Sequence, residues 1–326
     1  MIRPTPRISV IVPAYNCERT LGGTLTGLLT QTYPDVEIVV VDDGSTDRSA
    51  AIARAFGDLI VFDSIPNQGS GPARNHAMEL ASGSFIALCD ADDVLLPRHL
   101  EKAMEAWRHA GGGRRFVASN ARLLTPSGIT HGRDLGRYPL PQRREQRLRI
   151  LEANFVPVFT LGPREMFTEV GGFGSEEFSE DWDIWVRAVF AGWEAVGQPE
   201  PHALYRWSSA SKTTNAEENF DADEEVLARI QANRHVLLTP AEQAYLTRRL
   251  SSGSPRRFQR QGDLSARAGD RRDARANYRA AVRLLPHNTR LRWKARFAAT
   301  PPTALLLRQV LNHLDTRLGR NPTDPR

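Results

Sequence analysis

The sequence predicts an α/β fold with a mostly parallel sheet flanked by helices, followed by an all-helical extension. Short apolar runs alternate with segments of helical periodicity over residues 8–107. From about residue 240 onward, helical periodicity alone remains. Alternating strands and helices favour a parallel sheet with right-handed crossovers, in which ligands bind outside the carboxyl ends of the strands.

Four apolar runs in the alternating part are predicted strands. They are short, rich in Val, Ile or Leu, and cover residues 8–13, 36–41, 59–62 and 85–89. The second run is continuously apolar, which is typical of a strand buried on both faces. The expected helices cover residues 21–29, residues 45–56, a segment from residue 71 onward, and residues 97–107. Ser45 or Thr46 is the expected N-cap of the second helix, and Pro72 is tolerated in the first turn of the third.

The middle of the chain has a mixed pattern. Strands are predicted at residues 116–120, 156–161 and 203–207. Residues 180–190 form an amphipathic helix, whereas residues 208–219 are polar without a period and predict a loop.

The C-terminal part is basic. Residues 239–326 hold 19 Lys and Arg against 6 Asp and Glu, whereas residues 1–238 carry a net charge of −8. Residues 262–296 resemble one tetratricopeptide-type helix pair, which must pack on the body or a partner to bury its face. Residues 302–318 predict an amphipathic helix with an apolar stripe of Leu306, Val310, Leu314 and Leu318.

Composition narrows the class of protein. The chain has 326 residues, of which 40% are hydrophobic, and this suits a globular protein with a sizeable core. Cys17 and Cys89 lie at apolar stretches and are expected to be buried free thiols. The sequence shows no apolar signal core and no run of ~18 apolar residues, so we expect a soluble protein of a reducing compartment.

Two groups of carboxylates directly follow predicted strands. After the second strand, Asp43 could accept a hydrogen bond from a ring N–H of a base, although a plain strand-to-helix turn uses the same residue types. Asp90, Asp92 and Asp93 follow the fourth strand, and carboxylates this close repel one another unless a cation neutralises them. Mg²⁺ and Mn²⁺ prefer oxygen ligands and join carboxylates to diphosphates, so we expect a metal here, with a solvated turn as the alternative.

Two further segments carry candidate functional residues. Gly69 and Gly71 permit close backbone approach, and Arg74 could help hold a diphosphate at the following helix N-terminus, although such a loop alone is a weak signal. Glu180 and Asp181 begin the amphipathic helix, where acids ordinarily complement the helix dipole. A carboxylate here could instead serve as a general base, its pKa raised by neighbouring acids and by Trp182. The rings of Trp182 and Trp185 could stack on an acceptor sugar, although this spacing is more typical of core residues.

Together these motifs resemble one family. In the expected order, the chain contains VIVPAYN at 10–16, VDDGSTD at 41–47, GSGPARN at 69–75, DADD at 90–93 and ED at 180–181. Over about residues 6–215 it resembles the family 2 inverting glycosyltransferases of GT-A fold. The resemblance implies sugar transfer from a nucleotide-sugar, with a UDP-sugar favoured, to an acceptor hydroxyl. It implies a GT-A catalytic domain at 1–238, with a nucleotide-binding half at 1–110 and an acceptor-binding half at 111–238, followed by a basic helical extension at 239–326.

The resemblance also implies roles for individual residues. Nucleotide-binding residues would be Pro13, Tyr15, Asn16, Asp43, Gly69, Gly71, Arg74 and Asp90. In a DXD motif, Asp92 with Asp90 or Asp93 would hold Mn²⁺ or Mg²⁺ on the donor diphosphate. Asp181 would deprotonate the acceptor hydroxyl in a single displacement that inverts the anomeric configuration, and Glu180 would position that base or contact the acceptor.

The chain departs from the processive members of this family. Those members carry Gln-x-x-Arg-Trp and membrane helices, whereas here Arg206 and Trp207 are present and Ala203 replaces the Gln. We therefore expect a single-addition enzyme of polysaccharide, lipopolysaccharide or other glycoconjugate synthesis in the cell envelope. Arg206, Trp207 and Lys212 are candidate lid residues over the donor, with an ordinary edge strand as the alternative for the first two.

Other functions compete with this interpretation. A nucleotidyltransferase would carry a basic Gly-rich loop directly after the first strand, where this chain has residues 14–17, AYNC. A nucleotide-sugar-binding adaptor acting through its helical tail is a second alternative, but Asp92 and Asp181 favour an enzyme. We expect a nucleotide-sugar donor and a carbohydrate or glycolipid acceptor as partners, no nucleic acid, and a cytoplasmic location. Peripheral membrane contact through the basic C-terminal helices is a further hypothesis.

Overall fold

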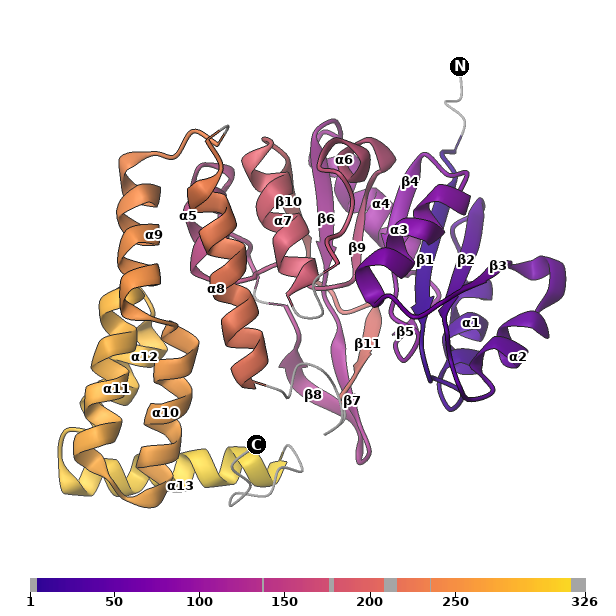
Figure 1. Cartoon of the computed structure of the whole chain (residues 1–326). Helices are drawn as coiled ribbons and strands as arrows, with labels where there is room; N and C mark the ends of the chain where they lie inside the picture. Colours follow the sequence, from indigo (N-terminus) through magenta and orange to yellow (C-terminus); the bar gives the residue numbers. More distant parts are fainter. Residues whose placement is uncertain (1–4, 137, 176–178, 208–215, 235, 318–326) are drawn as a thin grey trace. The chain divides into compact units, whose positions relative to one another are not determined.

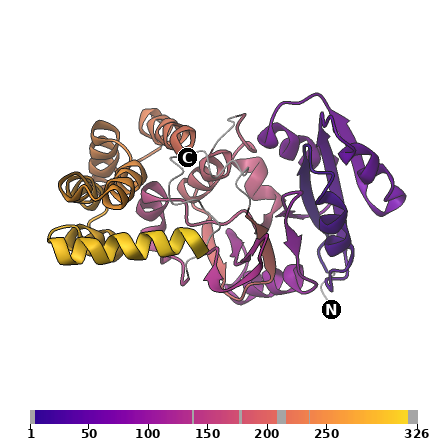
Figure 2. The ribbon, with the colours of Figure 1, turned by 90° about the horizontal axis from the view of Figure 1, so that it is seen from below.

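The chain folds into two units, an α/β unit over Met1–Ser208 and a helical unit over Ser209–Arg326 (Figure 1, Figure 2). The computed structural model describes residues 5–317 apart from 137, 176–178, 208–215 and 235. The sequence placed the division after residue 238, whereas helix α8 (Ala216–Ala232) belongs to the second unit. It does so because it packs on α9 (Pro240–Ser252) and α10 (Pro255–Ala268).

A seven-stranded sheet organises the first unit, in the order β10-β6-β9-β4-β1-β2-β3. The strands are β1 (Ile8–Ala14), β2 (Val36–Asp43), β3 (Val61–Ile65), β4 (Phe85–Leu88), β6 (Arg115–Ser119), β9 (Thr160–Pro163) and β10 (Glu194–Gln198). Strand β1 pairs in parallel with β2 and β4, whereas β9 is antiparallel to β4 and β6. The predicted α/β fold with a mostly parallel sheet is confirmed.

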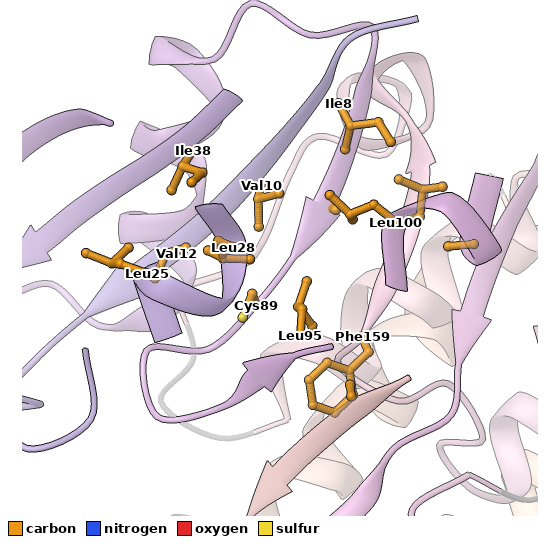
Figure 3. Close-up of a cluster of buried hydrophobic side chains, with 14 of the residues drawn as sticks. Ile8, Val10, Val12, Leu25, Leu28, Ile38, Cys89, Leu95, Leu100 and Phe159 are labelled. Carbon is orange, nitrogen blue, oxygen red and sulfur yellow. The ribbon is translucent and has the colours of Figure 1, made fainter. Parts of the chain in front are cut away.

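Helices cover both faces of this sheet. They are α1 (Leu21–Leu29), α2 (Ser49–Arg54), α3 (Ser70–Leu80), α4 (His99–His109), α5 (Arg143–Glu152), α6 (Arg164–Glu169) and α7 (Glu180–Phe190). On one face, β1 packs with α1 and α4 around a buried core (Figure 3) that contains Ile8, Val10, Leu25, Leu28 and Leu100. On the other face, α3 packs against β1 and β2, and Trp185 of α7 stacks on Phe116 with ring centroids 5.4 Å apart. This two-sided burial explains why β2 reads as a continuous apolar run.

A second sheet, which the sequence did not predict as a unit, has the order β5-β11-β7-β8. Its strands are β5 (Val94–Leu95), β7 (Arg122–Thr125), β8 (Gly128–Asp134) and β11 (Ala203–Arg206). The strand predicted at residues 203–207 is confirmed as β11. Because β11 lies between β5 and β7, the alternative of an edge strand is wrong.

Some predicted boundaries differ from the observed ones for identifiable reasons. Helix α2 begins at Ser49, and neither Ser45 nor Thr46 caps it, because these two residues bind the neighbouring loop. The strand predicted at 156–161 begins only at Thr160, since Pro157 lacks the N–H that a sheet ladder needs. Strand β3 is preceded by a 3₁₀ turn at Gly57–Leu59, which delays its start to Val61.

The second unit is helical, as predicted, and continues with α11 (Arg271–Leu284), α12 (Thr289–Phe297) and α13 (Pro301–Arg317). Helices α10 and α11 pack closely because Gly262 leaves room for the Tyr278 ring, which a side-chain carbon there would approach to 2.7 Å. The Tyr278 hydroxyl donates to Asp263 at 2.6 Å, and Lys294 of α12 binds the same carboxylate. Of the predicted apolar stripe of α13, Leu306 and Val310 are exposed, and Leu314 and Leu318 lie outside the residues whose side chains are described. The buried apolar residues of this helix are instead Leu307 and Leu311.

Two other expectations concern the chain as a whole. Cys17 and Cys89 are free thiols, Cys89 fully buried and Cys17 partly so, as predicted. Among the residues that the structure describes, no helix is long and apolar enough to cross a membrane.

Candidate active site

The loop after β1 is fastened to the loop after β2. The side-chain oxygen of Asn16 accepts the Thr46 N–H at 2.9 Å, and the Cys17 N–H donates to Ser49 Oγ at 2.8 Å. The Asn16 N–H also donates to Ser45 Oγ at 2.9 Å, and the Thr46 hydroxyl donates to the Asn16 side-chain oxygen at 3.3 Å. These two bonds explain the serine and threonine of the VDDGSTD motif, which the sequence suggested only as helix caps. Pro13 is half-buried, and Tyr15 is left 51% exposed beside this rigid loop. Their predicted contact with a base stays a prediction.

Asp43, at the end of β2, organises the Gly-rich segment. Its two carboxylate oxygens accept the backbone N–H groups of Gln68 and Gly69, each at 2.8 Å. Gly44 next to it has φ +72°, and a side-chain carbon there would lie 2.8 Å from the Asn67 nitrogen. A carboxylate accepts several hydrogen bonds, so this positioning role, which the sequence did not reveal, is compatible with the predicted base contact.

Helix α3 holds the segment that precedes α7. A side-chain carbon at Gly71 would collide with the carbonyl oxygen of Gly174, so only glycine permits this approach. The Asn75 amide donates to the Phe173 carbonyl at 2.9 Å and accepts the Phe173 N–H at 2.8 Å. The GSGPARN motif thus positions the start of the helix that carries Glu180 and Asp181.

The buried Arg74 joins three of the predicted motifs. Its guanidinium donates to Asp90 Oδ1 at 2.7 Å and to Glu180 Oε1 at 2.8 Å, and it lies 5.2 Å from the Phe173 ring centroid. Burial alone would lower the pKa of Arg74, but the two carboxylates raise it, so the residue is a permanent cation. Conversely, burial raises the pKa of Glu180, but Arg74 and the Ser70 hydroxyl, which donates to it at 2.7 Å, give a net lowering.

The acid cluster after β4 divides its carboxylates among different partners. Asp90 pairs with Arg74, and the fully buried Asp93 accepts the Arg206 backbone N–H at 2.7 Å. The other Asp93 oxygen has no partner among the described residues. Burial, followed by the neighbouring Asp90, raises the pKa of Asp92 to about 6 and that of Asp93 well above its usual range.

This cluster suits a cation that is shared with a substrate. The described residues contain no group of three or more His, Cys, Asp or Glu side chains placed to hold a metal by themselves. Mg²⁺ and Mn²⁺ sites often use one or two carboxylates and complete their coordination with phosphate oxygens and water. The unpaired Asp93 oxygen and the raised pKa of Asp92 show that described residues do not fully compensate these carboxylates, so the residues present fit such a cation.

Asp181 is held in place by groups that the sequence did not single out. Asn154 donates its side-chain amide to Asp181 Oδ2 at 3.0 Å, and the Trp182 N–H donates to Oδ1 at 2.7 Å. Burial, followed by the charge of Glu180, raises the pKa of Asp181 to about 7, against an opposing effect of Arg74. No local pattern marks Asn154, because its role depends on a contact with a helix 27 positions away.

The two tryptophans of α7 are core residues, and the idea that they stack on an acceptor sugar is wrong. Trp182 is 3% exposed and donates its indole N–H to the Ile150 carbonyl at 2.7 Å, and Trp185 is fully buried. Their rings fill the space between α7, α5 and the sheet, where helical spacing places apolar side chains.

The proposed lid residues fall into two groups. Arg206 donates its Nε–H to the Asp92 carbonyl at 2.7 Å, and the Trp207 N–H donates to the Leu124 carbonyl at 2.9 Å. Both belong to the framework that supports the acid cluster. Lys212 lies outside the described residues.

Comparison with known proteins identifies the family. Residues 9–171 match the family model described as Glycosyl transferase family 2. The chain belongs to this family. It is therefore a glycosyltransferase, which transfers a sugar from a nucleotide-sugar, and the predicted resemblance is confirmed. The match ends before α7, so the Glu180–Asp181 pair lies outside the matched residues.

Curated relatives and solved structures are similar to this chain. The putative glycosyltransferase EpsE of Bacillus subtilis is 28% identical over 75% of this chain and 88% of its own length. The uncharacterized glycosyltransferase YibD of Escherichia coli is 36% identical, but over only 44% of this chain and 47% of its own length. S. aureus TarS 1-349, solved with UDP-GlcNAc, has a TM-score of 0.59 at 18% identity, with 96% of this chain and 92% of that chain covered. This likeness supports the GT-A fold.

Proposed function

We propose that this glycosyltransferase performs a metal-dependent, inverting, single addition of a sugar from a UDP-sugar to an acceptor hydroxyl. The acceptor would be a carbohydrate or glycolipid in polysaccharide, lipopolysaccharide or other glycoconjugate synthesis. The observation that carries the proposal is the buried Arg74, which joins the acid cluster after β4 to the acidic start of α7. It supports a single site in which leaving-group stabilisation and proton removal occur side by side.

Asp181 is the proposed general base. A base works best when its pKa is close to the operating pH, and the pKa of Asp181 is raised to about 7. The acceptor hydroxyl would give its proton to an Asp181 oxygen while its own oxygen forms the bond to the anomeric carbon. The bond from that carbon to the diphosphate oxygen would break, and the nucleoside diphosphate would leave with the electron pair. A direct displacement of this kind inverts the configuration.

Asp92 and Asp90 are the proposed metal-binding residues, with Asp93 as the third member of the motif. A bound Mn²⁺ or Mg²⁺ would act as a Lewis acid toward the diphosphate. Asp92 has no hydrogen bond from another described side chain, which makes it the carboxylate best placed to accept a cation. Asp93 supports this role indirectly. It accepts the Arg206 backbone N–H, and the Arg206 side chain in turn donates to the Asp92 carbonyl.

The donor and the mode of addition are finer proposals. TarS was solved with UDP-GlcNAc, and a 30% identical E. coli relative is named a UDP-Glc-dependent β-1,3-glucosyltransferase. A mannosyltransferase from Pyrobaculum calidifontis with TM-score 0.56 was instead solved with GDP-Man and Mn²⁺, so the base must be measured. Single addition is supported by Ala203, which is fully buried in β11 where processive enzymes carry a glutamine.

Calorimetry with a panel of UDP-, GDP- and dTDP-sugars, with and without Mn²⁺ or Mg²⁺, tests the proposal. We expect a UDP-sugar to bind most tightly and only in the presence of the metal. Equally tight binding in a chelator would contradict the metal dependence, and preference for a GDP-sugar would contradict the choice of base. NMR of the first product formed from an α-linked donor should show a β-glycoside, and mass spectrometry should show one added sugar.

A further inference from the structure

We propose that exposed side chains of α12 and α13 dock the protein on a bilayer that contains anionic phospholipid. This α12–α13 surface is defined by Arg292, Trp293, Arg296, Leu305, Leu306 and Val310. All six residues belong to the second unit. The proposal therefore stands or falls independently of the reaction proposed for the first unit.

The apolar half of the surface lies mainly on α13. This helix uses Leu307 and Leu311 to close the core that contains Ala274 and Tyr278. Three of its other large apolar side chains are exposed to solvent, with Leu305 58%, Leu306 47% and Val310 38% exposed. Leu306 and Val310 are one helical turn apart and so share a side of the helix. Exposed apolar residues that gather in this way mark an interaction site.

Helix α12, which packs on α13, adds an aromatic residue and positive charge. It buries Leu291 and Lys294 and leaves Trp293 42% exposed. The Trp293 ring is stacked on Phe297, with ring centroids 3.8 Å apart. Arg292 and Arg296 are exposed on that same outward side, since they lie one turn apart and away from the buried positions. Tryptophan is favoured where one end of a side chain is wet and the other apolar, as at a bilayer interface.

The positive charge of this region favours an anionic partner. Residues 289–312 contain five Lys and Arg and no Asp or Glu. Lys294 is neutralised by Asp263 at 2.5 Å, but Arg290, Arg292, Arg296 and Arg308 are exposed and make no ion pair with a described residue. Nucleic acid would satisfy the arginines but leave the leucines in water. A phospholipid surface satisfies both, because its headgroups are anionic and its acyl boundary is apolar.

The shape of α13 fits this partner. Figure 2 shows it as a long straight helix along one side of the other helices of the second unit. An amphipathic helix of this form lies in the plane of the interface and buries its apolar side among the acyl chains.

Vesicle co-sedimentation of the full chain tests the proposal. One set of vesicles is phosphatidylcholine, and in the other about a third of the lipid is phosphatidylglycerol. We expect sedimentation only with the anionic vesicles. R292E/R296E should weaken it about tenfold or more, since each arginine near such a surface strengthens binding about fivefold. L306S/V310S should also weaken it about tenfold, because it removes the inserted apolar groups.

The matched control is R234E/R248E, which makes the same change in charge at exposed arginines of the second unit outside α12 and α13. Circular dichroism should show that all three variants remain folded, as expected for exposed positions. Failure of the wild-type protein to sediment with anionic vesicles would overturn the proposal. So would an equal loss in the control, which would indicate a general charge effect. Unchanged binding of L306S/V310S, with displacement by RNA, would identify a polyanion site instead and would equally overturn it.

Discussion

The acid cluster after β4 and the acidic start of α7 contain the same residue type but are compensated differently. At the start of α7, Glu180 takes Arg74 and Ser70 as partners, and its pKa is lowered, while the adjacent Asp181 has a pKa of about 7. After β4, Asp90 takes Arg74 and Asp93 takes a backbone N–H, while Asp92 keeps a pKa of about 6. In each region, one carboxylate has a raised pKa, and these two are the proposed acceptors of a proton (Asp181) and of a metal ion (Asp92).

The largest expected effect comes from removing the proton acceptor. D181N should lower kcat by about 10²–10⁴-fold, because an amide cannot take the proton of the acceptor hydroxyl. Donor affinity, measured by calorimetry with metal, should change less than about threefold, since the residue is proposed to act on the acceptor. D58N, at an exposed carboxylate of the 3₁₀ turn, is the control and should behave as wild type. A D181N enzyme with undiminished kcat would remove Asp181 from the mechanism.

Arg74 links the acid cluster after β4 to the acidic start of α7, because it donates to a carboxylate of each. R74M should lower the free energy of unfolding by about 3 kcal/mol, because it leaves Glu180 uncompensated and largely buried beside Asp90. Urea denaturation measures this loss. R98M, which breaks the exposed pair of Arg98 with Glu101, should cause a much smaller loss, because both charges are solvated in either state. Equal losses in the two variants would mean that the buried network contributes nothing beyond a surface ion pair.

Within the acid cluster, Asp92 and Asp93 should respond differently to substitution. D92N should weaken metal-dependent donor binding about tenfold and leave the fold intact, whereas D93N should mainly destabilise the protein by disturbing the Arg206 contact. Since burial raises the pKa of Asp92 from 3.8 to about 6, the folded protein holds this proton more tightly than the unfolded chain. The contribution of Asp92 to stability should therefore fall as the pH rises from about 4 to 6, and this part of the pH dependence should be absent in D92N. Identical behaviour of the two variants in calorimetry and thermal denaturation would contradict the distinction.

The sequence predicts the parts of the site that lie at strand ends better than those that depend on distant contacts. Asp43 ends β2, and Asp90 and Asp92 follow β4. Because both strands are parallel to β1, their carboxyl ends lie at one edge of the sheet, so the position of these residues at that edge could be expected. The bond of Arg74 to Glu180 joins residues 106 positions apart, and no local pattern records it. The same limit applies to α13, where periodicity could not tell which of two apolar stripes is buried.

The fold likewise contains elements that the sequence predicts accurately and elements whose bounds it misses. Strands with continuous apolar runs, such as β1 and β2, were predicted nearly to their ends, because burial on both faces leaves a strong pattern. Helix α2 and strand β9 were misplaced, since Ser45 and Thr46 bind a neighbouring loop and Pro157 interrupts the ladder. These are tertiary or single-residue effects that composition within a window does not report.

The smallest expected effect concerns the pH dependence of Asp181, the proposed base at the start of α7. Because Asp181 must be ionised to accept a proton, kcat/KM should rise with pH and level off above a pKa of about 7. Asn154 donates a hydrogen bond to this carboxylate, which favours its charged form, so N154A should move the rising limb upward by less than about one pH unit. N277A, which removes a side-chain bond to the Asp273 carbonyl in the second unit, is the control and should leave the profile unchanged.

At a pH well above the rising limbs of both the wild type and N154A, the variant should recover most of the wild-type rate, because ionisation of Asp181 is then complete. A rate that stays low at every pH would show that Asn154 acts on the position of the carboxylate and not on its charge. A limb that moves downward would contradict the assignment of that limb to Asp181.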